Sequence, residues 1–275
     1  MKNIVAVNTN TYHAFPVEEA LRGIARAGFR FVELTAVRGW TEHVMPEHGE
    51  ARLRSVQRLM EQLGLTCVAL SGHCNLLDPE RLQDFRKNMA LARFFGAGWI
   101  LSSTGEAHFG KDERFTDEAL IRSVRSLLPD LEKYDLRLGL EVHGDYGTGE
   151  SLMPIVNAVD SPRVGINYDT GNALYYGGRL PGDDVKTCLP RVNFIHLKDK
   201  IGGKGVWNFP AIGSGELDLA GFIRGAREGG YDGPLSIEIE YTQDFTMNPK
   251  KPGDIETADR AVRDSYDYLH ARGLV

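Results

Sequence analysis

A chain of 275 residues with 42% hydrophobic and 25% charged side chains can bury a large core without disulfides or other staples. Its formal net charge of −6 gives no general attraction to phosphate backbones, so we expect no nucleic-acid partner. Three cysteines without a CxxC pair, no signal-peptide pattern and no apolar run of the roughly 20 residues that a membrane span needs predict a cytoplasmic protein without membrane contact.

Short aliphatic or β-branched runs recur along the whole chain, and turn residues bound each of them. Such runs are typical of buried parallel strands. Eight strands are therefore predicted, at Ile4–Val7, Phe31–Leu34, Leu65–Leu70, Trp99–Leu101, Leu136–Val142, Val164–Asn167, Val192–Leu197 and Leu235–Ile239.

Amphipathic stretches lie between these runs and predict helices. The stretch 17–28 places Leu21 and Ile24 on one stripe and ends at Gly28, a residue suited to a helix C-terminus. Thr116 supplies the first half of a capping-box pattern, with Ala119 where a Glu would complete it. Further helices are predicted at 50–64, 79–96, 116–134, 218–230 and 256–273, with shorter and weaker ones near 152–158 and 183–189.

A strand followed by a helix eight times predicts a parallel sheet, and eight such units in a chain of this length most simply close into a barrel. No linker, charge block or shift in composition divides the chain. The expected fold class is therefore α/β, with residues 1–275 forming a single (β/α)8 TIM barrel. A homodimer is the commonest assembly for such a chain, and we expect that one is possible.

Polar residues gather where the predicted strands end, which is where barrels of this class build their active sites. They are Glu33, His73, Glu141 and His143 in "GLEVHGD", Asp169 and Asn172 in "NYDTGN", His196 and Lys198 in "FIHLKDK", and Glu238 and Glu240 in "LSIEIE".

Aliphatic and polar residues alternate in "LSIEIE", so Glu238 and Glu240 share one face of the last strand. Because the aliphatic face packs on the helices, Glu238 is expected to point into the barrel mouth. An unpaired carboxylate there is costly to desolvate, and a bound cation would remove that cost. The same reasoning applies to Glu141 and His196. Periodicity alone does not choose between Glu238 and Glu240.

Three carboxylates and one imidazole, from Glu141, Asp169, His196 and Glu238, would make an oxygen-rich site. Such a site favours Mn2+ or Mg2+ and accepts Co2+ or Zn2+. We therefore expect one divalent metal ion per chain, with Mn2+ as the first choice. The alternative for the same residues is a set of internal ion pairs, such as Glu238 with Lys198.

These segments resemble the xylose isomerase-like barrel superfamily, the sugar isomerase and epimerase group that also contains endonuclease IV. The resemblance extends over nearly the whole chain and rests on "GLEVHG", "NYDTGN", "FIHLKD", "IGSGELDL" and "GGYDGPLSIEIE". It implies one divalent metal held by Glu141, Asp169, His196 and Glu238. The segment "GYDGPLSIE" makes Glu238, rather than Glu240, the match to the family.

The resemblance also implies an isomerase or epimerase acting on a sugar or keto-polyol. Glu141 and Glu238 would remove and return a proton beside the carbonyl while the metal stabilises the enediolate. His143 would lie close to Glu141 as a further catalytic group. The substrate would contact Glu33, His73, Asn172 and Lys198.

Each of these supporting residues has a structural alternative. Glu33 and His73 could make internal pairs or hydrogen bonds, and Asn172 could cap a helix. Lys198 could pair with Asp199. Aromatic residues near the strand ends could cover an apolar sugar face or simply pack within loops; they are Tyr12, Trp40, Phe109, Tyr175, Tyr176, Trp207 and Phe209.

Two positions depart from the family pattern. Asn172 stands where some members have His, and Gly202 stands where ketose 3-epimerases usually have Arg. Ketose 3-epimerase specificity is therefore not implied.

Three other functions compete with the isomerase. A lyase of the inosose dehydratase or 3-keto-glycoside eliminase type would use the same scaffold, with His143 as acid or base. An endonuclease IV-like repair enzyme, which "GHCNLLDPE" and His108 faintly suggest, needs a multi-zinc cluster with more His ligands. Asn172 and the net charge disfavour it. The intact ligand quartet disfavours a binding protein without catalysis.

Overall fold

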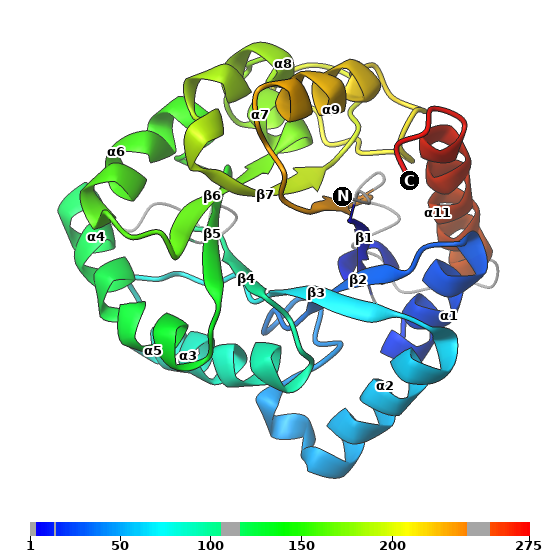
Figure 1. Ribbon diagram of the computed structural model, residues 1–275, viewed down its shortest axis with the longest axis horizontal. Coiled ribbons are helices and arrows are strands. Elements are labelled where there is room, and N and C mark those ends of the chain that lie inside the picture. The colour runs from blue at the N-terminus through cyan, green and yellow to red at the C-terminus, as the bar shows by residue number, and fades with distance from the viewer. Residues whose placement is uncertain (1–3, 14, 106–115, 241–253) are drawn as a thin grey trace.

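The computed structural model describes residues 4–13, 15–105, 116–240 and 254–275. Eight parallel strands form a closed barrel surrounded by helices (Figure 1), which confirms the predicted fold class. Val5 pairs with Leu235 and closes the ring. The strands are β1 (Val5–Asn8), β2 (Phe31–Thr35), β3 (Thr66–Ser71), β4 (Trp99–Ser102), β5 (Arg137–Glu141), β6 (Val164–Asp169), β7 (Val192–Leu197) and β8 (Leu235–Ile237).

The helices lie outside the ring, as Figure 1 shows. In α1 the buried stripe includes Leu21 and Ile24, and Gly28 ends the helix with a φ of 110°. The helices are α1 (Val17–Ala27), α2 (Glu50–Leu63), α3 (Pro79–Phe94), α4 (Asp117–Ser126), α5 (Leu128–Lys133), α6 (Gly149–Val159), α7 (Thr170–Tyr175), α8 (Pro181–Asp184), α9 (Leu219–Glu228) and α11 (Asp254–His270), with short 3-10 turns η1 (Thr9–Tyr12), η2 (Pro46–His48), η3 (Val185–Thr187) and η4 (Leu189–Arg191).

The single helix predicted over 116–134 is two helices. α4 begins at the predicted cap, where Thr116 accepts a hydrogen bond from the Ala119 amide. It ends at Ser126, because Pro129 has no N–H to continue the ladder and instead lies in the first turn of α5. Helix α7, directly after β6, was not predicted at all.

The buried apolar side chains of the described residues form two clusters. The larger one includes Ile195 and fills the space between the sheet and the helices. The smaller one includes Ala6, Leu101 and Phe194. Phe194 and His196 are the neighbours of Ile195 on β7, so their side chains point to the other face of the sheet, which is the barrel interior. Their ring centroids are 5.9 Å apart. The barrel interior therefore has an apolar floor beneath polar residues at the carboxyl ends.

Among the described helices, none is long and apolar enough to cross a membrane. His108 and Phe109 lie outside the described residues.

Candidate metal centre

Four side chains meet at the carboxyl end of the barrel. Glu141 ends β5, Asp169 ends β6, His196 lies near the end of β7 and Glu238 directly follows β8. One potential ligand atom from each lies within 4.8 Å of the others, and all four residues are buried. The structure thus brings together the predicted quartet, which includes Glu238 and leaves out Glu240. Metal binding itself stays a prediction.

The His196 ring lies between two groups of carboxylates. Its Nδ1 is 2.7 Å from Glu141 Oε1, 3.7 Å from Glu238 Oε2 and 3.9 Å from Asp169 Oδ2. Its Nε2 is 3.1 Å from both oxygens of Glu33. An imidazole that binds a metal with one nitrogen commonly donates its other N–H to a carboxylate. His196 is placed to do this, with Nδ1 toward the quartet and Nε2–H toward Glu33.

Glu33 has no exposed surface and lies between His196 and Asn8. The Asn8 amide group donates to Glu33 Oε1 and to Glu238 Oε1, each at 3.1 Å. The Asn8 oxygen accepts from the Thr35 hydroxyl, which fixes the orientation of the amide. Glu33 therefore supports His196 in this structure, and its contact with a substrate stays a prediction.

Asp169 has two different oxygens. Oδ1 accepts a hydrogen bond from the Asn172 amide at 2.8 Å and caps α7. Oδ2 accepts no hydrogen bond from the described residues, although Lys198 Nζ lies 3.3 Å away. Burial raises the pKa of Asp169 to about 7, against the opposing charge of Lys198. A buried carboxylate oxygen without a donor is a position where a cation would be stabilising.

Lys198 makes internal ion pairs of the kind that the sequence offered as the alternative to a metal site. Its Nζ is 2.8 Å from Glu238 Oε2 and 2.9 Å from Glu240 Oε2. Burial alone would lower the pKa of Lys198, but Asp169 and these two carboxylates outweigh it and raise the pKa. Burial likewise opposes ionisation of Glu238, and the charges of Lys198 and His196 outweigh it to lower its pKa.

These pairs do not balance the charge of the cluster. Within the described part of the chain, Lys198 and His196 make most of the ion-pair contacts with the carboxylates, and His73 lies 3.5 Å from Glu141. Buried acidic groups in such excess favour either proton uptake or a cation. Five carboxylates meet here, from Glu33, Glu141, Asp169, Glu238 and Glu240.

The two predicted pocket histidines differ in their partners. His73 Nδ1 accepts a hydrogen bond from the Ser103 amide at 2.8 Å, so this nitrogen carries no proton. It lies 3.5 Å from Glu141 Oε2, on the side of the carboxylate away from His196. His143 Nε2 lies 3.1 Å from the Tyr176 hydroxyl. The substrate contacts predicted for His73, Asn172 and Lys198 stay predictions.

Asp199 is not the partner of Lys198. Its carboxylate accepts hydrogen bonds from the amides of Lys200, Gly213, Gly215 and Leu217. A Cβ at position 215 would lie 2.2 Å from Asp199 Oδ1, so glycine is required for this approach. Asp199 thus fastens the end of the loop after β7, which accounts for the glycines of "IGSGELDL".

The loop after β7 builds an aromatic wall with α7. Tyr175 packs against Trp207 and Phe209, with centroid distances of 5.5 and 5.7 Å. Lys198 Nζ lies 4.9 Å from the Phe209 ring centre, which places the wall beside the cluster. Gly202, in the same loop, has a φ of 78° and a Cβ there would lie 2.9 Å from Val206. An arginine at position 202 would therefore be strained in this backbone.

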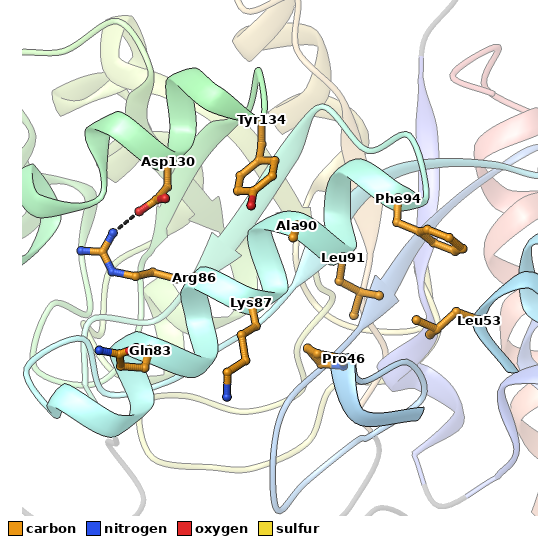
Figure 2. A pocket seen from close by; sticks show the side chains of 10 residues that line it. All are labelled: Pro46, Leu53, Gln83, Arg86, Lys87, Ala90, Leu91, Phe94, Asp130 and Tyr134. Atoms are coloured by element: carbon orange, nitrogen blue, oxygen red, sulfur yellow. Dashed lines mark hydrogen bonds and ion pairs between the residues drawn. The ribbon is translucent and has the colours of Figure 1, made fainter. Parts of the chain in front are cut away.

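A separate open pocket lies on the outside of the barrel, between α2, α3 and α5 (Figure 2). It has a volume of about 450 Å³, and Arg86 on its wall pairs with Asp130. Leu53, Leu91 and Phe94 supply its apolar lining. None of the quartet contributes to it, so it is not part of the candidate centre.

A model of the xylose isomerase-like TIM barrel family matches residues 21–270. The chain belongs to the xylose isomerase-like TIM-barrel family. Members of this family are enzymes and include isomerases, epimerases and dehydratases. The family agrees with the resemblance found in the sequence.

Individual relatives are more distant. A 3-oxo-isoapionate decarboxylase of Pectobacterium atrosepticum is 38% identical over 86 residues, which are 30% of this chain and 29% of the relative. An inosose dehydratase of Clostridium botulinum is 27% identical over 155 residues, 50% of each chain. These matches thus span half or less of the relatives' length.

A solved structure shows the same fold over the whole chain. It is a xylose isomerase-like TIM-barrel protein from Mycobacterium smegmatis in complex with magnesium. Its TM-score is 0.78 at 18% identity, and the match covers 100% of this chain and 99% of that one.

Proposed function

We propose that this protein is a divalent-metal-dependent enzyme that moves a proton beside the carbonyl of a sugar or keto-polyol, with isomerisation or epimerisation as the outcome. The observation that carries the proposal is the convergence of two buried carboxylates, Glu141 and Glu238, with Asp169 and His196. Membership of a family of isomerases, epimerases and dehydratases supports it.

The donor set fits a divalent cation. Asp169 Oδ2 lacks a hydrogen-bond donor among the described residues, His196 Nδ1 faces the carboxylates, and negative charge is in excess. The quartet would hold Mn2+ in the first place, or Mg2+, Co2+ or Zn2+. The similar fold from M. smegmatis binds magnesium. When bound, the cation would polarise the substrate carbonyl and stabilise the negative charge that develops as the proton leaves.

Glu141 and Glu238 would remove and return the proton. Glu238 Oε1 accepts hydrogen bonds from Asn8 and Asn10, which leaves Oε2 as its reactive oxygen. Glu141 Oε1 lies 2.7 Å from His196, which leaves its Oε2 on the side of His73. Glu238 Oε2 also has Lys198 Nζ at 2.8 Å, so in each carboxylate one oxygen is fixed by neighbouring side chains and the other faces the basic residue, Lys198 or His73, beside which a substrate would bind. A positioned carboxylate of this kind accelerates proton transfer by ~10²–10⁴-fold.

A lyase is the second candidate, and the pair of His143 and Tyr176 favours it. Their side chains lie 3.1 Å apart, so either could deliver a proton to a departing hydroxyl group. The inosose dehydratase among the relatives supports the same candidate. Both candidates begin with the same proton abstraction, and they differ in the step after it.

The test combines metal analysis with solvent exchange. Protein purified without chelator is expected to contain about one divalent ion per chain. Incubation in D2O with a panel of ketoses and inososes should then place deuterium on the carbon beside the carbonyl. A product of unchanged carbon skeleton and composition supports the isomerase, whereas loss of water supports the lyase. A metal-free protein that exchanges no substrate of the panel would refute both.

A further inference from the structure

Asn10 links the candidate metal centre to the loop that follows β2. The amide group of Asn10 donates to Glu238 Oε1 at 3.1 Å and to Glu240 Oε1 at 3.2 Å. The oxygen of the same amide accepts from Trp40 Nε1 at 3.1 Å and from Thr41 Oγ1 at 2.6 Å. Asn10 is buried, with 7% of its surface exposed. All of its side-chain hydrogen-bonding capacity is thus used by two carboxylates and one loop.

The orientation of this amide is set by its partners. An indole N–H can only donate and an ionised carboxylate can only accept, so the Asn10 oxygen must face Trp40 and its nitrogen must face Glu238. A flipped amide would lose every one of these bonds. Asn10 therefore has one stable orientation, and that orientation depends on Trp40 and Thr41.

The chain of hydrogen bonds continues outward to His13. The Thr41 hydroxyl has one proton, which it gives to Asn10, so His13 Nδ1 must be the donor in its 2.6 Å contact with Thr41 Oγ1. The His13 ring also stacks on Trp40, with centroids 4.3 Å apart and planes at 21°. Protons are therefore donated in one direction, from His13 through Thr41 and Asn10 to Glu238.

The loop that carries Trp40 and Thr41 is held at both ends. We call residues 36–45 the Trp40 loop. Ala36 pairs with Glu42, Val37 N bonds to Thr41 O, and Val44 N bonds to Thr35 O. These backbone hydrogen bonds hold Trp40 Nε1 and Thr41 Oγ1 in position independently of Asn10.

We propose that Asn10 is a positioning residue through which the Trp40 loop fixes Glu238 for metal binding and proton transfer. The proposal rests on the proposed function, because it concerns the same carboxylate. Two amides, of Asn8 and Asn10, saturate Glu238 Oε1 and direct Oε2 to the centre. Without the Trp40 loop the Asn10 amide could rotate, and Glu238 would lose one of these two donors.

The test measures metal affinity, which needs no substrate. Mn2+ is titrated calorimetrically into metal-free protein. Trp40→Phe keeps an aromatic ring and removes the N–H, and it should weaken Mn2+ binding about 3- to 10-fold, the value of one net hydrogen bond. Asn10→Ala should weaken it ~10–100-fold, as is usual for a group that orients a metal ligand. Thr41→Val, of nearly equal volume, should resemble Trp40→Phe.

Trp99→Phe is the matched control. Trp99 lies at the opposite end of the barrel, where β4 begins, and its ring packs on Phe194 and Arg137. This variant should bind Mn2+ like the wild type. Thermal unfolding of each variant identifies any that does not fold, and Thr41→Val replaces Trp40→Phe if the latter fails.

Double variants separate coupling from general weakening. Trp40→Phe combined with Asn10→Ala should bind Mn2+ no more weakly than Asn10→Ala alone, because both act through one amide. Wild-type affinity in both Trp40→Phe and Thr41→Val, or additive losses in the double variant, would overturn the inference while the proposed function stands. A wild-type protein that binds none of Mn2+, Mg2+, Co2+ and Zn2+ would overturn the proposed function and this inference together.

Discussion

Glu33 offers a direct test of how His196 is oriented. It accepts from His196 Nε2 through both oxygens at 3.1 Å and from Asn8 at 3.1 Å, and it is fully buried. Glu33→Gln keeps the shape of the side chain and one acceptor oxygen but removes the charge. The hydrogen bond from His196 Nε2–H should then be weaker, and the ring should be oriented with Nδ1 toward the metal site for less of the time.

The expected magnitude can be worked out from these contacts. A hydrogen bond to a charged group is worth about 1.5–3 kcal/mol and one between neutral groups about 0.5–1.5 kcal/mol. The difference of roughly 1–1.5 kcal/mol corresponds to about a 5- to 12-fold loss of metal affinity. Glu33→Ala removes both acceptors and should cost ~10–100-fold.

Calorimetric titration of Mn2+ measures both variants, with the exposed Glu228 as a control site. Glu228→Gln removes a charge of the same kind far from the centre and should bind Mn2+ like the wild type. If Glu33→Ala also kept wild-type affinity, Glu33 would not orient a metal ligand, and a direct role at the substrate would become the better explanation.

The site and the core supply three more tests. Asp169→Asn and His196→Ala should lose metal and turnover together in elemental analysis and assay, and full retention of both by either would show that the quartet is wrong. Glu141→Gln and Glu238→Gln should retain part of the metal yet slow exchange of substrate hydrogen in D2O by ~10²–10⁴-fold; exchange at the wild-type rate in both would exclude these bases. Burial lowers the pKa of His43 from 6.5 to about 4, so its contribution to stability is complete above pH 6.5 and is lost as the pH falls toward 4. Urea unfolding should show about 2 kcal/mol of this loss between pH 7 and pH 5, and His43→Gln should lack it; an equal loss in both proteins would contradict the assignment.

The residues of the quartet that lie at the carboxyl ends of strands could be predicted from the sequence because one physical rule applies to all of them. A polar side chain that alternates with aliphatic ones must face the barrel interior, and this places Glu141, His196 and Glu238. The same rule applies to Asn8, the last residue of β1, whereas Asn10 lies two residues further on, in the 3-10 turn η1. They were missed because amides carry no charge and bind no metal themselves, although their position was informative.

Other features depend on contacts that no local pattern contains. Glu33 meets His196 across the barrel, from strands separated by 163 residues, so periodicity could not reveal that Glu33 supports a ring nitrogen. Helix α7 is too short for an apolar stripe and begins at Asp169, whose charge suggested only a ligand. The division between α4 and α5 could be predicted from Pro129. The amphipathic pattern continues through this position, however, and so indicated a single helix.

The anchoring of the loop after β7 has a consequence for redesign. Asp199 holds this loop at Gly213, Gly215 and Leu217, so the residues between Lys200 and Gly213 are bracketed by a fixed attachment at each end. A replacement segment of different length should therefore be tolerated if Asp199 and the two glycines are kept. Phe209 in this segment also exchanges two backbone hydrogen bonds with Glu240, so an exchange that keeps this pairing would change the rest of the aromatic wall and leave the quartet in place. Substrate choice could then be altered as a module, separately from the chemistry beneath it.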